Sequence, residues 1–308
     1  MPDERNGHGS APSANADNSL AQIIAALRPK LHRYCARMTG SAIDGEDIVQ
    51  EALLKAVEAF PHAAPLDNPE GWLFRIAHNS ALDFLRRRAR HHAVHSDEDF
   101  EMIAAPENPV IDRQIAAASL RTFMRLPAAQ RSAIILRDVL GYSIEEIGEI
   151  IGGASVPAVK GALQRGRIAL RELAGEPEEI APPVLAAPER ARLMGYIDRF
   201  NARDFDSLRD MLADDVRLEL VNRLRMNGRE EVGQYYHRYR HAPTAWRCQP
   251  GFVDGRAAIL MSDPNDPAGA PAYFVLLEWT DGRIVGIRDF IFARYAIEGA
   301  EVVALGAE

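Results

Sequence analysis

Apolar side chains recur every three or four residues through most of the first 175 positions of the chain. This spacing predicts amphipathic helices over residues 20–60 and, after a loop with three prolines at 61–69, over residues 69–88. Helices are expected to resume near Ile111 and to continue to residue 175. In the first stretch, the apolar residues that follow the capping residue Asp44 should face inward, namely Ile48, Leu53, Leu54 and Val57.

Residues 142–171 predict two short helices joined by a tight turn. Gly152 and Gly153 should end the first helix, because glycine tolerates the backbone angles that terminate helices. Ser155 and Pro157 suit the start of the second helix. That helix has one apolar face for docking and one basic, polar face, which suits the major groove of DNA. The apolar face contains Val156, Val159, Leu163 and Leu170, and the polar face contains Lys160, Gln164, Arg167 and Arg171.

Two glycines in the second helix, Gly161 and Gly166, would each cost about 1 kcal/mol relative to alanine. Close approach to DNA would account for that cost. Taken alone, the pattern also fits an ordinary amphipathic helical hairpin with a solvated basic face. The choice between the two interpretations depends on the segments upstream.

The pattern changes after a segment rich in proline and glutamate at residues 176–188. Residues 189–212 still predict amphipathic helix. Runs typical of strands then follow at 216–221, 246–253, 257–261, 273–280 and 284–295, with Asp-Gly turns between several of them. Helices followed by a meander of strands indicate an α+β domain with one curved sheet.

Charge is segregated along the chain. The net charge of −8 over 308 residues excludes a uniformly basic nucleic-acid coat, so any DNA binding must come from local patches. Residues 72–92 carry five arginines against one acidic residue, whereas residues 96–112 carry six acidic residues and no lysine or arginine. Such blocks indicate separate surfaces with separate partners.

The two cysteines, Cys35 and Cys248, lie far apart in the sequence, which fits a reducing cytoplasm without a disulfide. No apolar run approaches the roughly 20 residues of a membrane span. Residues 1–18 are polar, lack the apolar core of a signal peptide and are expected to be disordered. The sequence therefore predicts a cytoplasmic protein with no membrane partner.

Two segments upstream of the helical pair carry further candidate chemistry. Asp47, Gln50 and Glu51 lie at i, i+3 and i+4, so they share one exposed helix face that suits a basic protein partner. Residues 68–88 combine aromatic residues, Asn79 and an arginine run on one helix. That combination suits single-stranded DNA, because unpaired bases stack on rings and the backbone attracts arginine.

In this order the motifs resemble those of the extracytoplasmic-function group of bacterial RNA polymerase sigma factors, over about residues 20–173. The Asp-Ile-Val-Gln-Glu-Ala segment at 47–52 is similar to region 2.2, which grips the clamp helices of the polymerase. Residues 72–88 resemble regions 2.3 and 2.4, which melt and read the −10 element. Leu126-Pro127 with Gln130-Arg131 resembles the start of region 4, and residues 155–171 resemble its −35 recognition helix.

The resemblance implies core RNA polymerase, through its clamp and flap regions, and promoter DNA as partners. Polymerase would be bound by Asp47, Gln50 and Glu51. The −10 region would be contacted by Ala63, Trp72, Asn79, Arg86, Arg87 and Arg88, with Asn79 and the 60–71 loop holding a flipped base. The −35 region would be contacted by Lys160, Gly161, Gln164, Arg165, Arg167 and Arg171. No catalytic residue, metal or cofactor is implied. Ala63 stands where the family often has a bulkier residue, so the −10 preference is not predicted.

Residues 201–216 and the strands after them resemble the SnoaL-like members of the nuclear-transport-factor-2-like cone fold. Some sigma factors carry such a domain in place of control by a separate anti-sigma protein. The resemblance implies regulation through a small ligand or an intramolecular contact. Catalysis is an alternative for a cone fold, with acid–base candidates Asp198, Tyr235, His237, Glu278 and Asp289. The His91-His92-x-x-His95 cluster lacks a structural frame, so no metal is expected.

The expected organisation is multidomain, with two all-α domains followed by an α+β domain. It comprises a disordered N-terminus (1–18), a region 2 domain (19–92), an acidic linker (93–112), a region 4 helix-turn-helix domain (113–175), a Pro/Glu linker (176–188) and a SnoaL-like regulatory domain (189–303). The predicted function is promoter-specific initiation of transcription with core polymerase, modulated by the last domain.

Two alternatives stay open at this point. One is a helix-turn-helix regulator that acts without polymerase, and the other is a cone-fold sensor or enzyme fused to a DNA-binding module. The face formed by Asp47, Gln50 and Glu51 discriminates between them, because it has no role in a simple repressor.

Overall fold

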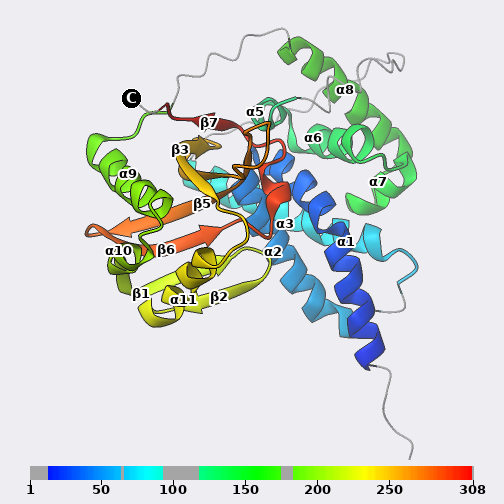
Figure 1. The fold of residues 1–308 in the computed structure, drawn as a ribbon. Coiled ribbons are helices and arrows are strands. Elements are labelled where there is room, and N and C mark those ends of the chain that lie inside the picture. Colours follow the sequence, from blue (N-terminus) through cyan, green and yellow to red (C-terminus); the bar gives the residue numbers. More distant parts are fainter. Residues whose placement is uncertain (1–12, 64–65, 93–117, 175–182, 307–308) are drawn as a thin grey trace, which may run out of the picture. The chain divides into compact units, whose positions relative to one another are not determined.

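The computed structural model describes residues 13–63, 66–92, 118–174 and 183–306, and these form two compact units (Figure 1). The first unit contains residues 13–39, 44–92 and 126–168. The second contains residues 183–306 together with 169–174 and the short segments 40–43 and 118–125. The acidic linker expected at 93–112 and most of the Pro/Glu linker lie outside the described residues.

The first unit is built from helices. In chain order they are α1 (Ser13–Thr39), α2 (Ala42–Ala59), the short 3₁₀ turn η1 (Phe60–His62), α3 (Pro69–His92), α6 (Ala128–Ile134), the π-helical turn η2 (Ile135–Val139), α7 (Ile144–Ile150) and α8 (Val156–Ala174). Helix α1 begins at Ser13, inside the segment expected to be disordered, while residues 1–12 lie outside the described residues. The all-α class predicted for this part of the chain is confirmed.

The buried face of α2 differs from the predicted one. Ile48 and Leu53 are buried as expected, but 66% of Leu54 and 53% of Val57 are exposed. The core side of the helix is instead completed by Val49 and by alanines at 52 and 56. Alanine side chains are small enough to pack where α2 lies close to the core. The buried face of α2 therefore includes Ala52 and Ala56 and leaves out Leu54 and Val57, the larger residues of the apolar stripe. The inward placement of Leu54 and Val57 was therefore wrong.

The helix-turn-helix forms as the sequence predicts, except that Val156, which was expected on the docking face of α8, is 36% exposed. Gly152 and Gly153 both adopt positive φ angles, 92° and 84°, at the end of α7, where a residue with a side chain would be strained. Ser155 caps α8, because its Oγ accepts a hydrogen bond from the Ala158 amide at 3.4 Å. A reciprocal capping box between Ser143 and Glu146, which the sequence analysis missed, fixes the start of α7.

Gly166 has a packing role rather than a DNA-binding one. A Cβ atom at this position would lie 2.4 Å from Ile134 Cδ1 and 3.2 Å from Gln130 Cβ, both on α6. Helix α8 therefore approaches α6 too closely for any side chain at 166. The expectation that close approach to DNA accounts for this glycine was wrong, because the space beside it is filled by the protein itself.

The second unit has the α+β architecture that was predicted. Its helices are α5 (Leu120–Met124), α9 (Ala187–Asn201), α10 (Phe205–Asp210) and α11 (Arg229–Arg240), with a 3₁₀ turn η3 (Arg294–Ile297). Its strands are β1 (Leu212–Leu220), β2 (Leu224–Asn227), β3 (Arg247–Val253), β4 (Arg256–Ser262), β5 (Pro271–Thr280), β6 (Arg283–Asp289) and β7 (Val302–Ala304).

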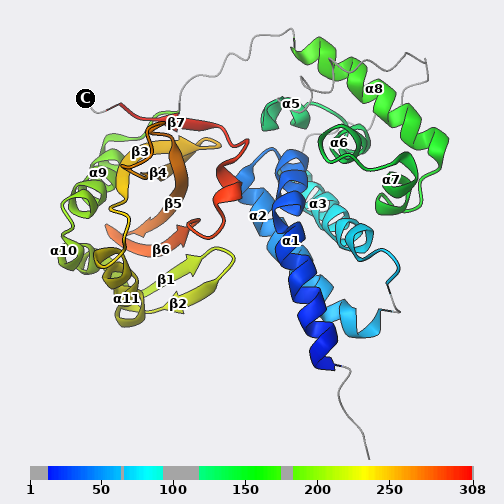
Figure 2. The same cartoon turned by 45° about the vertical axis from the view of Figure 1, so that its right-hand side comes forward.

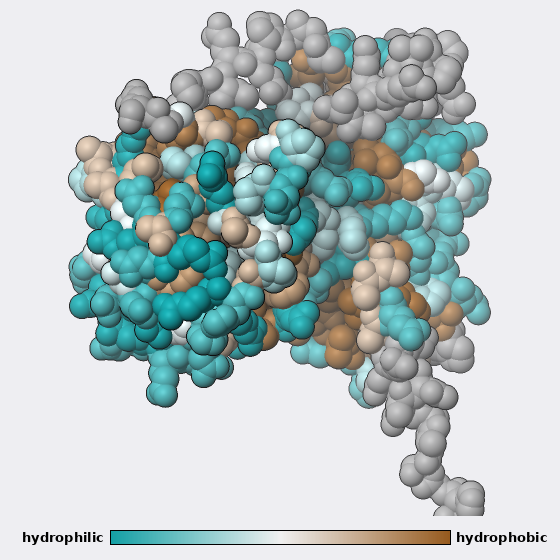
Figure 3. Space-filling model, viewed as in Figure 1, coloured by the Kyte–Doolittle hydropathy of each residue, from teal (hydrophilic) through white to brown (hydrophobic). Residues whose placement is uncertain are grey.

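Within the described residues, these strands form one mixed sheet in the order β2-β1-β6-β5-β4-β3-β7. The β1–β6 pair is parallel and the other pairs are antiparallel. Helices α9, α10 and α11 lie along one face of the curved sheet (Figure 2), and their aromatic side chains join the strands in one core. The surface over α10 and α11 is hydrophilic (Figure 3).

Most expected strands are present, with three differences. Strands β2 and β7 were not predicted. The run at 284–295 ends as a strand at Asp289 and continues into a loop and η3, and residues 229–240 form a helix that the sequence analysis did not predict. The turns Asp254-Gly255 and Asp281-Gly282 have positive φ angles at both residues, as tight hairpin turns require. The Asp-Gly signals therefore placed these hairpins correctly.

Candidate nucleic-acid interface

Helix α3 carries the residues expected to contact the −10 region. Asn68 caps it, because its side-chain Oδ1 accepts a hydrogen bond from the Gly71 amide at 2.9 Å. At 24 residues the helix is about 36 Å long, so one face can follow several nucleotides. Trp72, Asn79 and Arg86 repeat every seven residues and therefore share a face, on which Asn79 and Arg86 are exposed.

The loop before α3 is connected to this face through aromatic packing. The ring of Phe60 lies 6.4 Å from that of Trp72, centroid to centroid. The amide of Ala63 donates to the Phe60 carbonyl at 3.1 Å, which ends η1 beside the ring pair. Phe60, within the 60–71 loop that was expected to hold a flipped base, therefore packs on Trp72 of α3.

The three arginines expected to act together have different environments. Arg86 is paired with Asp83 on its own helix at 3.1 Å and keeps 70% of its side chain exposed. Arg87 reaches Glu51 on α2 at 3.2 Å, and Arg88 donates to the Thr39 carbonyl at 3.4 Å. Successive helix positions point about 100° apart, so the three guanidinium groups leave the helix in different directions. Arg86 has the guanidinium most open to solvent.

The face of α2 expected to bind polymerase is present and extends further than predicted. Asp47 is exposed, Gln50 and Glu51 are half-buried, and the exposed Leu54 continues the same stripe one turn later. Burial alone would raise the pKa of Glu51, but hydrogen bonds from Lys55 at 2.7 Å and Arg87 at 3.2 Å hold it below its usual value. Acidic, amide and apolar groups are thus combined on one surface.

Helix α8 carries the residues expected to contact the −35 region, and they fall into two groups. Lys160 and Arg171 are exposed, and Gln164 and Arg165 are half-exposed, so all four can meet a ligand. Gly161 is buried in the helix, and a Cβ atom there would lie 3.2 Å from Arg165 Nη1.

Arg167 belongs to the structure of the fold rather than to this surface. Its Nε lies 2.9 Å from Asp138 Oδ2 and its Nη2 lies 2.5 Å from Asp138 Oδ1, so the pair is bidentate. The exposed fractions are only 19% for the Arg167 side chain and 2% for that of Asp138. This pair fixes α8 to η2.

Two of the acid–base candidates of the second unit meet in its core. Tyr235 and Tyr239 each donate a hydrogen bond to Asp289 Oδ2 at 2.8 Å, and the Ile291 amide donates to Oδ1 at 2.8 Å. Burial raises the pKa of Asp289 to about 6, although these hydrogen bonds act to lower it. Asp289 and both tyrosines are buried. The other candidates, Asp198, His237 and Glu278, are exposed and do not join them.

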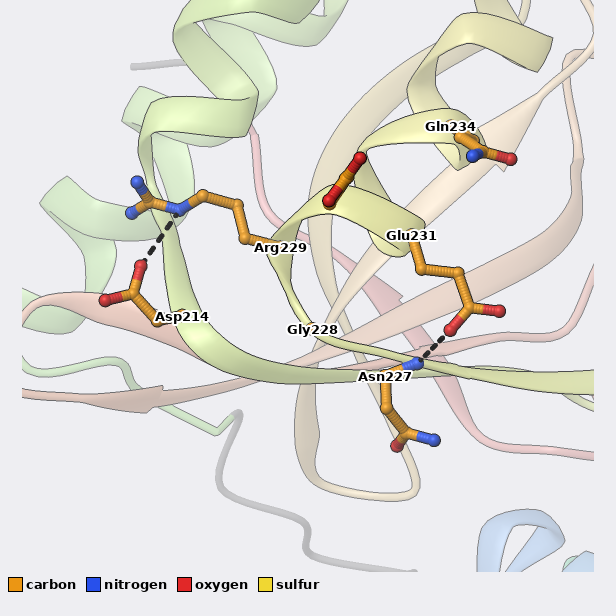
Figure 4. Close-up of a pocket in the computed structure, with 7 residues that line it drawn as sticks. Asp214, Asn227, Gly228, Arg229, Glu231 and Gln234 are labelled. Atoms are coloured by element: carbon orange, nitrogen blue, oxygen red, sulfur yellow. Dashed lines mark hydrogen bonds and ion pairs between the residues drawn. The ribbon is translucent and has the colours of Figure 1, made fainter.

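An open, polar hollow of about 510 Å³ lies at the start of α11 (Figure 4). Two of its charged groups have partners in the hollow: Arg229 Nε lies 3.5 Å from Asp214 Oδ1, and Glu231 Oε2 accepts a hydrogen bond from the Asn227 backbone amide at 2.9 Å. A second hollow of about 490 Å³ shares Arg229, Glu230 and Gln234 with it and includes His237.

Among the described side chains, no group of three or more His, Cys, Asp and Glu residues is placed to hold a metal ion. The side chains of the His91–His95 cluster lie outside that set. Over the same described residues, none of the helices combines the length and the apolar character needed to cross a membrane.

Comparisons with known proteins match both helical parts of the first half of the chain. The sequence family Sigma-70 region 2 matches residues 23–91, and Sigma-70, region 4 matches residues 120–170. The chain is 30% identical to the ECF RNA polymerase sigma factor SigG of Mycobacterium tuberculosis over 241 residues, which cover 69% of this chain and 64% of SigG. It is 31% identical to the RNA polymerase sigma factor CarQ of Myxococcus xanthus over 163 residues, which cover 53% of this chain and 93% of CarQ.

Among solved structures, the crystal structure of the extracytoplasmic function sigma factor SigJ of Mycobacterium tuberculosis is similar to 88% of this chain, with 95% of that chain covered, 20% identity and a TM-score of 0.34. The chain spans 61–64% of the length of the first curated relatives that it matches. Both family matches and the near-complete coverage of CarQ lead to one conclusion: the chain belongs to the extracytoplasmic-function family of RNA polymerase sigma factors.

Proposed function

We propose that this protein binds core RNA polymerase and directs promoter-specific initiation of transcription, in the cytoplasm, by recognising −10 and −35 elements. One observation carries the proposal: α3 and α8 each present an exposed polar or basic face, and α2 has an exposed acidic and apolar face whose Glu51 is ion-paired with Arg87 of α3. A DNA-binding module that acts without polymerase has no use for the α2 face.

We assign the polymerase clamp to the face of Asp47, Gln50, Glu51 and Leu54. A partner with basic and apolar groups would pair with the carboxylates and cover the leucine. The ion pair between Glu51 and Arg87 connects this face to α3. Polymerase that competes for Glu51 would release the Arg87 guanidinium towards DNA, so binding of the two partners would support each other.

Asn79 and Trp72 are the proposed readers of the −10 region, because an exposed amide can hydrogen-bond an unpaired base edge and a ring can stack on it. Lys160, Gln164, Arg165 and Arg171 are the proposed −35 contacts, and we propose that region 4 also meets the polymerase flap. Arg167 is proposed to hold the recognition helix in place through Asp138.

Run-off transcription with purified core polymerase on a randomised promoter library tests the function directly. We expect enriched promoters to share two short elements, and Gln164→Ala to relax the sequence preference in the upstream element only. A single bidentate base contact supports a discrimination of about 1–3 kcal/mol. Specific binding to duplex DNA with no response to core polymerase would instead favour the polymerase-independent regulator.

For the second unit we propose regulation of initiation rather than catalysis. Asp289 and its tyrosines are sealed in the core, and the exposed acid–base candidates do not converge on them. The polar hollow at α11 is the place where a small polar ligand would be accommodated. A protease site inserted between residues 176 and 182 allows the intact chain to be cut after folding. We expect cleavage to change transcription output, whereas equal output before and after cleavage would contradict coupling of the second unit to initiation.

A further inference from the structure

Helix α11 ends in two histidines that face away from the core of the second unit. His237 and His241 are four positions apart, so their side chains lie one turn apart on the same face of the helix. The centroids of the two imidazole rings lie 4.6 Å apart, and the ring planes are inclined by 57°. Both residues are exposed, and within the described part of the chain neither ring has a hydrogen bond or an ion pair. Both imidazoles are therefore available to one ligand from solvent.

The rest of the second unit holds the backbone under this pair in place. On the buried side of α11, Tyr235 and Tyr239 donate hydrogen bonds to Asp289, both at 2.8 Å. At the end of the helix, Arg203 Nη2 donates to the carbonyls of Tyr239 and Arg240 at 3.0 Å and 2.8 Å. These bonds satisfy carbonyl groups that would lack partners within the helix. Little ordering is thus needed before both rings can bind the same ligand.

The separation of the rings matches that of two imidazoles bound side by side to one metal ion. A metal ion lies about 2.1 Å from the nitrogen that binds it, which places it about 3.2 Å from the centroid of that ring. Two rings bound at a right angle would then have centroids about 4.5 Å apart, and two rings bound at a tetrahedral angle about 5.2 Å apart. The observed 4.6 Å lies close to the right-angled value. Exposed rings can rotate about χ2 to direct a nitrogen at the ion.

The ligand atoms decide which ions this pair can bind. Imidazole nitrogen suits late transition metals, whereas Mg²⁺ and Ca²⁺ prefer oxygen ligands. Coordination at right angles by nitrogen and oxygen is typical of Cu²⁺ and Ni²⁺. Among the described side chains, no third His, Cys, Asp or Glu completes a metal-binding group. Water or a small oxygen ligand would fill the other positions, and the hollow of about 490 Å³ that His237 borders has room for it.

The charged groups around the pair are compatible with a bound cation. Arg209 and Arg240 both pair with the carboxylate of Asp206, Arg240 at 3.3 Å, so this carboxylate offsets part of their charge. Arg238 is exposed, and salt screens its repulsion of an ion. The pair also lies at the C-terminal end of α11, where the helix dipole is negative. With two protein ligands in an exposed position, the site suits reversible binding rather than a permanent structural ion.

We propose that His237 and His241 form a surface site for a divalent late transition metal on the second unit. Binding of the ion does not depend on the proposed function in transcription. The sequence pattern did not predict residues 229–240 as a helix, so the relation between the two histidines appears only in the structure. An ion that joins two positions one turn apart binds the folded helix more tightly than the unfolded chain. It should therefore stabilise the second unit.

Calorimetric titration of the full, tag-free chain with NiCl₂ tests the site. The variant His91→Gln/His92→Gln/His95→Gln is the background chain, because that cluster contains three further imidazoles. We expect one equivalent of Ni²⁺ to bind the background chain, and MgCl₂ to give no binding. His237→Ala or His241→Ala should weaken the affinity for Ni²⁺ by about ten-fold or more, because the second imidazole binds the ion as an intramolecular ligand.

Two control variants separate chelation from the mere presence of histidine. His62→Ala removes an exposed histidine of the first unit and should leave the affinity unchanged. Arg238→His/His241→Ala keeps two histidines on α11 but directs them about 100° apart, so it should bind Ni²⁺ as weakly as His241→Ala. Circular dichroism checks that each variant is folded. The site is overturned if the background chain binds no Ni²⁺ at about 1 mM, or if the single variants or the relocated pair keep its affinity.

Pulse proteolysis in urea, with and without NiCl₂, measures the stabilisation in the same chains. Ni²⁺ should raise the urea midpoint of the second unit in the background chain and leave that of the first unit unchanged. In His241→Ala, Ni²⁺ at the same concentration should leave both midpoints unchanged. An equal rise for the second unit with and without His241 would assign the ion to other residues and refute the site.

Discussion

The two units place their polar chemistry in opposite ways. In the first unit the groups with most binding potential, such as Asp47, Asn79 and Lys160, project from helices into solvent. In the second unit the carboxyl of Asp289 is buried and accepts hydrogen bonds from Tyr235 and Tyr239. The first unit thus leaves its polar groups open to solvent, while the second encloses its carboxyl. A fold that can hold an active site need not expose one.

The units also bury ionisable groups of opposite type. Burial, with a smaller contribution from Arg86, lowers the pKa of His78 to about 4, and burial raises the pKa of Asp289 to about 6. The buried histidine therefore stays neutral down to about pH 4, whereas the buried carboxyl keeps its proton up to about pH 6. Their contributions to stability must respond to pH in opposite directions.

The largest effect is expected at the α2 face of the first unit. Leu54→Arg places a charge in a surface that should meet polymerase, and we expect at least a ten-fold loss of affinity for core polymerase, with promoter-directed transcription reduced accordingly. The melting temperature should change little, because Leu54 is mostly exposed. Val184→Arg is the control, since Val184 is an exposed apolar residue of the second unit. Polymerase capture by the folded Leu54 variant at wild-type affinity would show that this face is not the docking surface.

The next effect concerns His78. In the unfolded chain it gains a proton near pH 6.5, but in the folded unit only near pH 4. The first unit should therefore keep its full stability above about pH 6.5 and lose on the order of 3 kcal/mol as the pH falls towards 4. Pulse proteolysis in urea, with peptides of each unit quantified by mass spectrometry, measures this. His78→Gln should remove the pH dependence of the stability of the first unit and leave that of the second unit unchanged. A curve for the first unit that stays level in wild type would contradict the buried neutral histidine.

Asp289 should give the reverse dependence, of similar or slightly smaller size. Its folded-state pKa of about 6 lies above the value near 3.9 of an unfolded chain. The second unit should be most stable below about pH 4 and lose on the order of 2–3 kcal/mol as the pH rises to about 6. Asp289→Asn should remove this loss, whereas Asp198→Asn, at an exposed position, should not. The same proteolysis experiment measures the stability of both units in one sample. If the stability of both units changed with pH in the same direction, the predicted opposite dependence would be wrong.

The smallest effect separates two basic residues of α8. Lys160→Ala should remove one phosphate contact and reduce the slope of log affinity against log salt by about 0.9. Arg167→Ala should leave that slope unchanged but lower the melting temperature, because Asp138 would lose its buried partner. Promoter binding by polymerase holoenzyme across a salt series tests both. If the two variants change the slope equally, Arg167 contacts DNA in the bound state and the structural role is wrong.

The sequence by itself determined the local features of this protein. The helical period of the first half, the glycines at 152–153, the Ser155 cap and the Asp-Gly turns all depend on near neighbours, and the structure has them where they were expected. The motifs that identify the family are likewise continuous segments. Patterns of this kind can be read from the chain because their energetics are set within a few residues.

Tertiary structure alone decided which of these residues are exposed to a partner and which are buried or paired within the fold. Lys160 and Arg167 lie on the same face of a helical wheel. Only Arg167 pairs with Asp138, which precedes it by 29 residues in the chain. Leu54 belongs to an apolar stripe, but it is exposed because the neighbouring alanines of α2 face the core instead. The docking of Tyr34 on Ser132 and the enclosure of Asp289 join residues 98 and 54 positions apart. No local pattern encodes such pairs, because they depend on how whole elements pack and on which polar groups then lose their water.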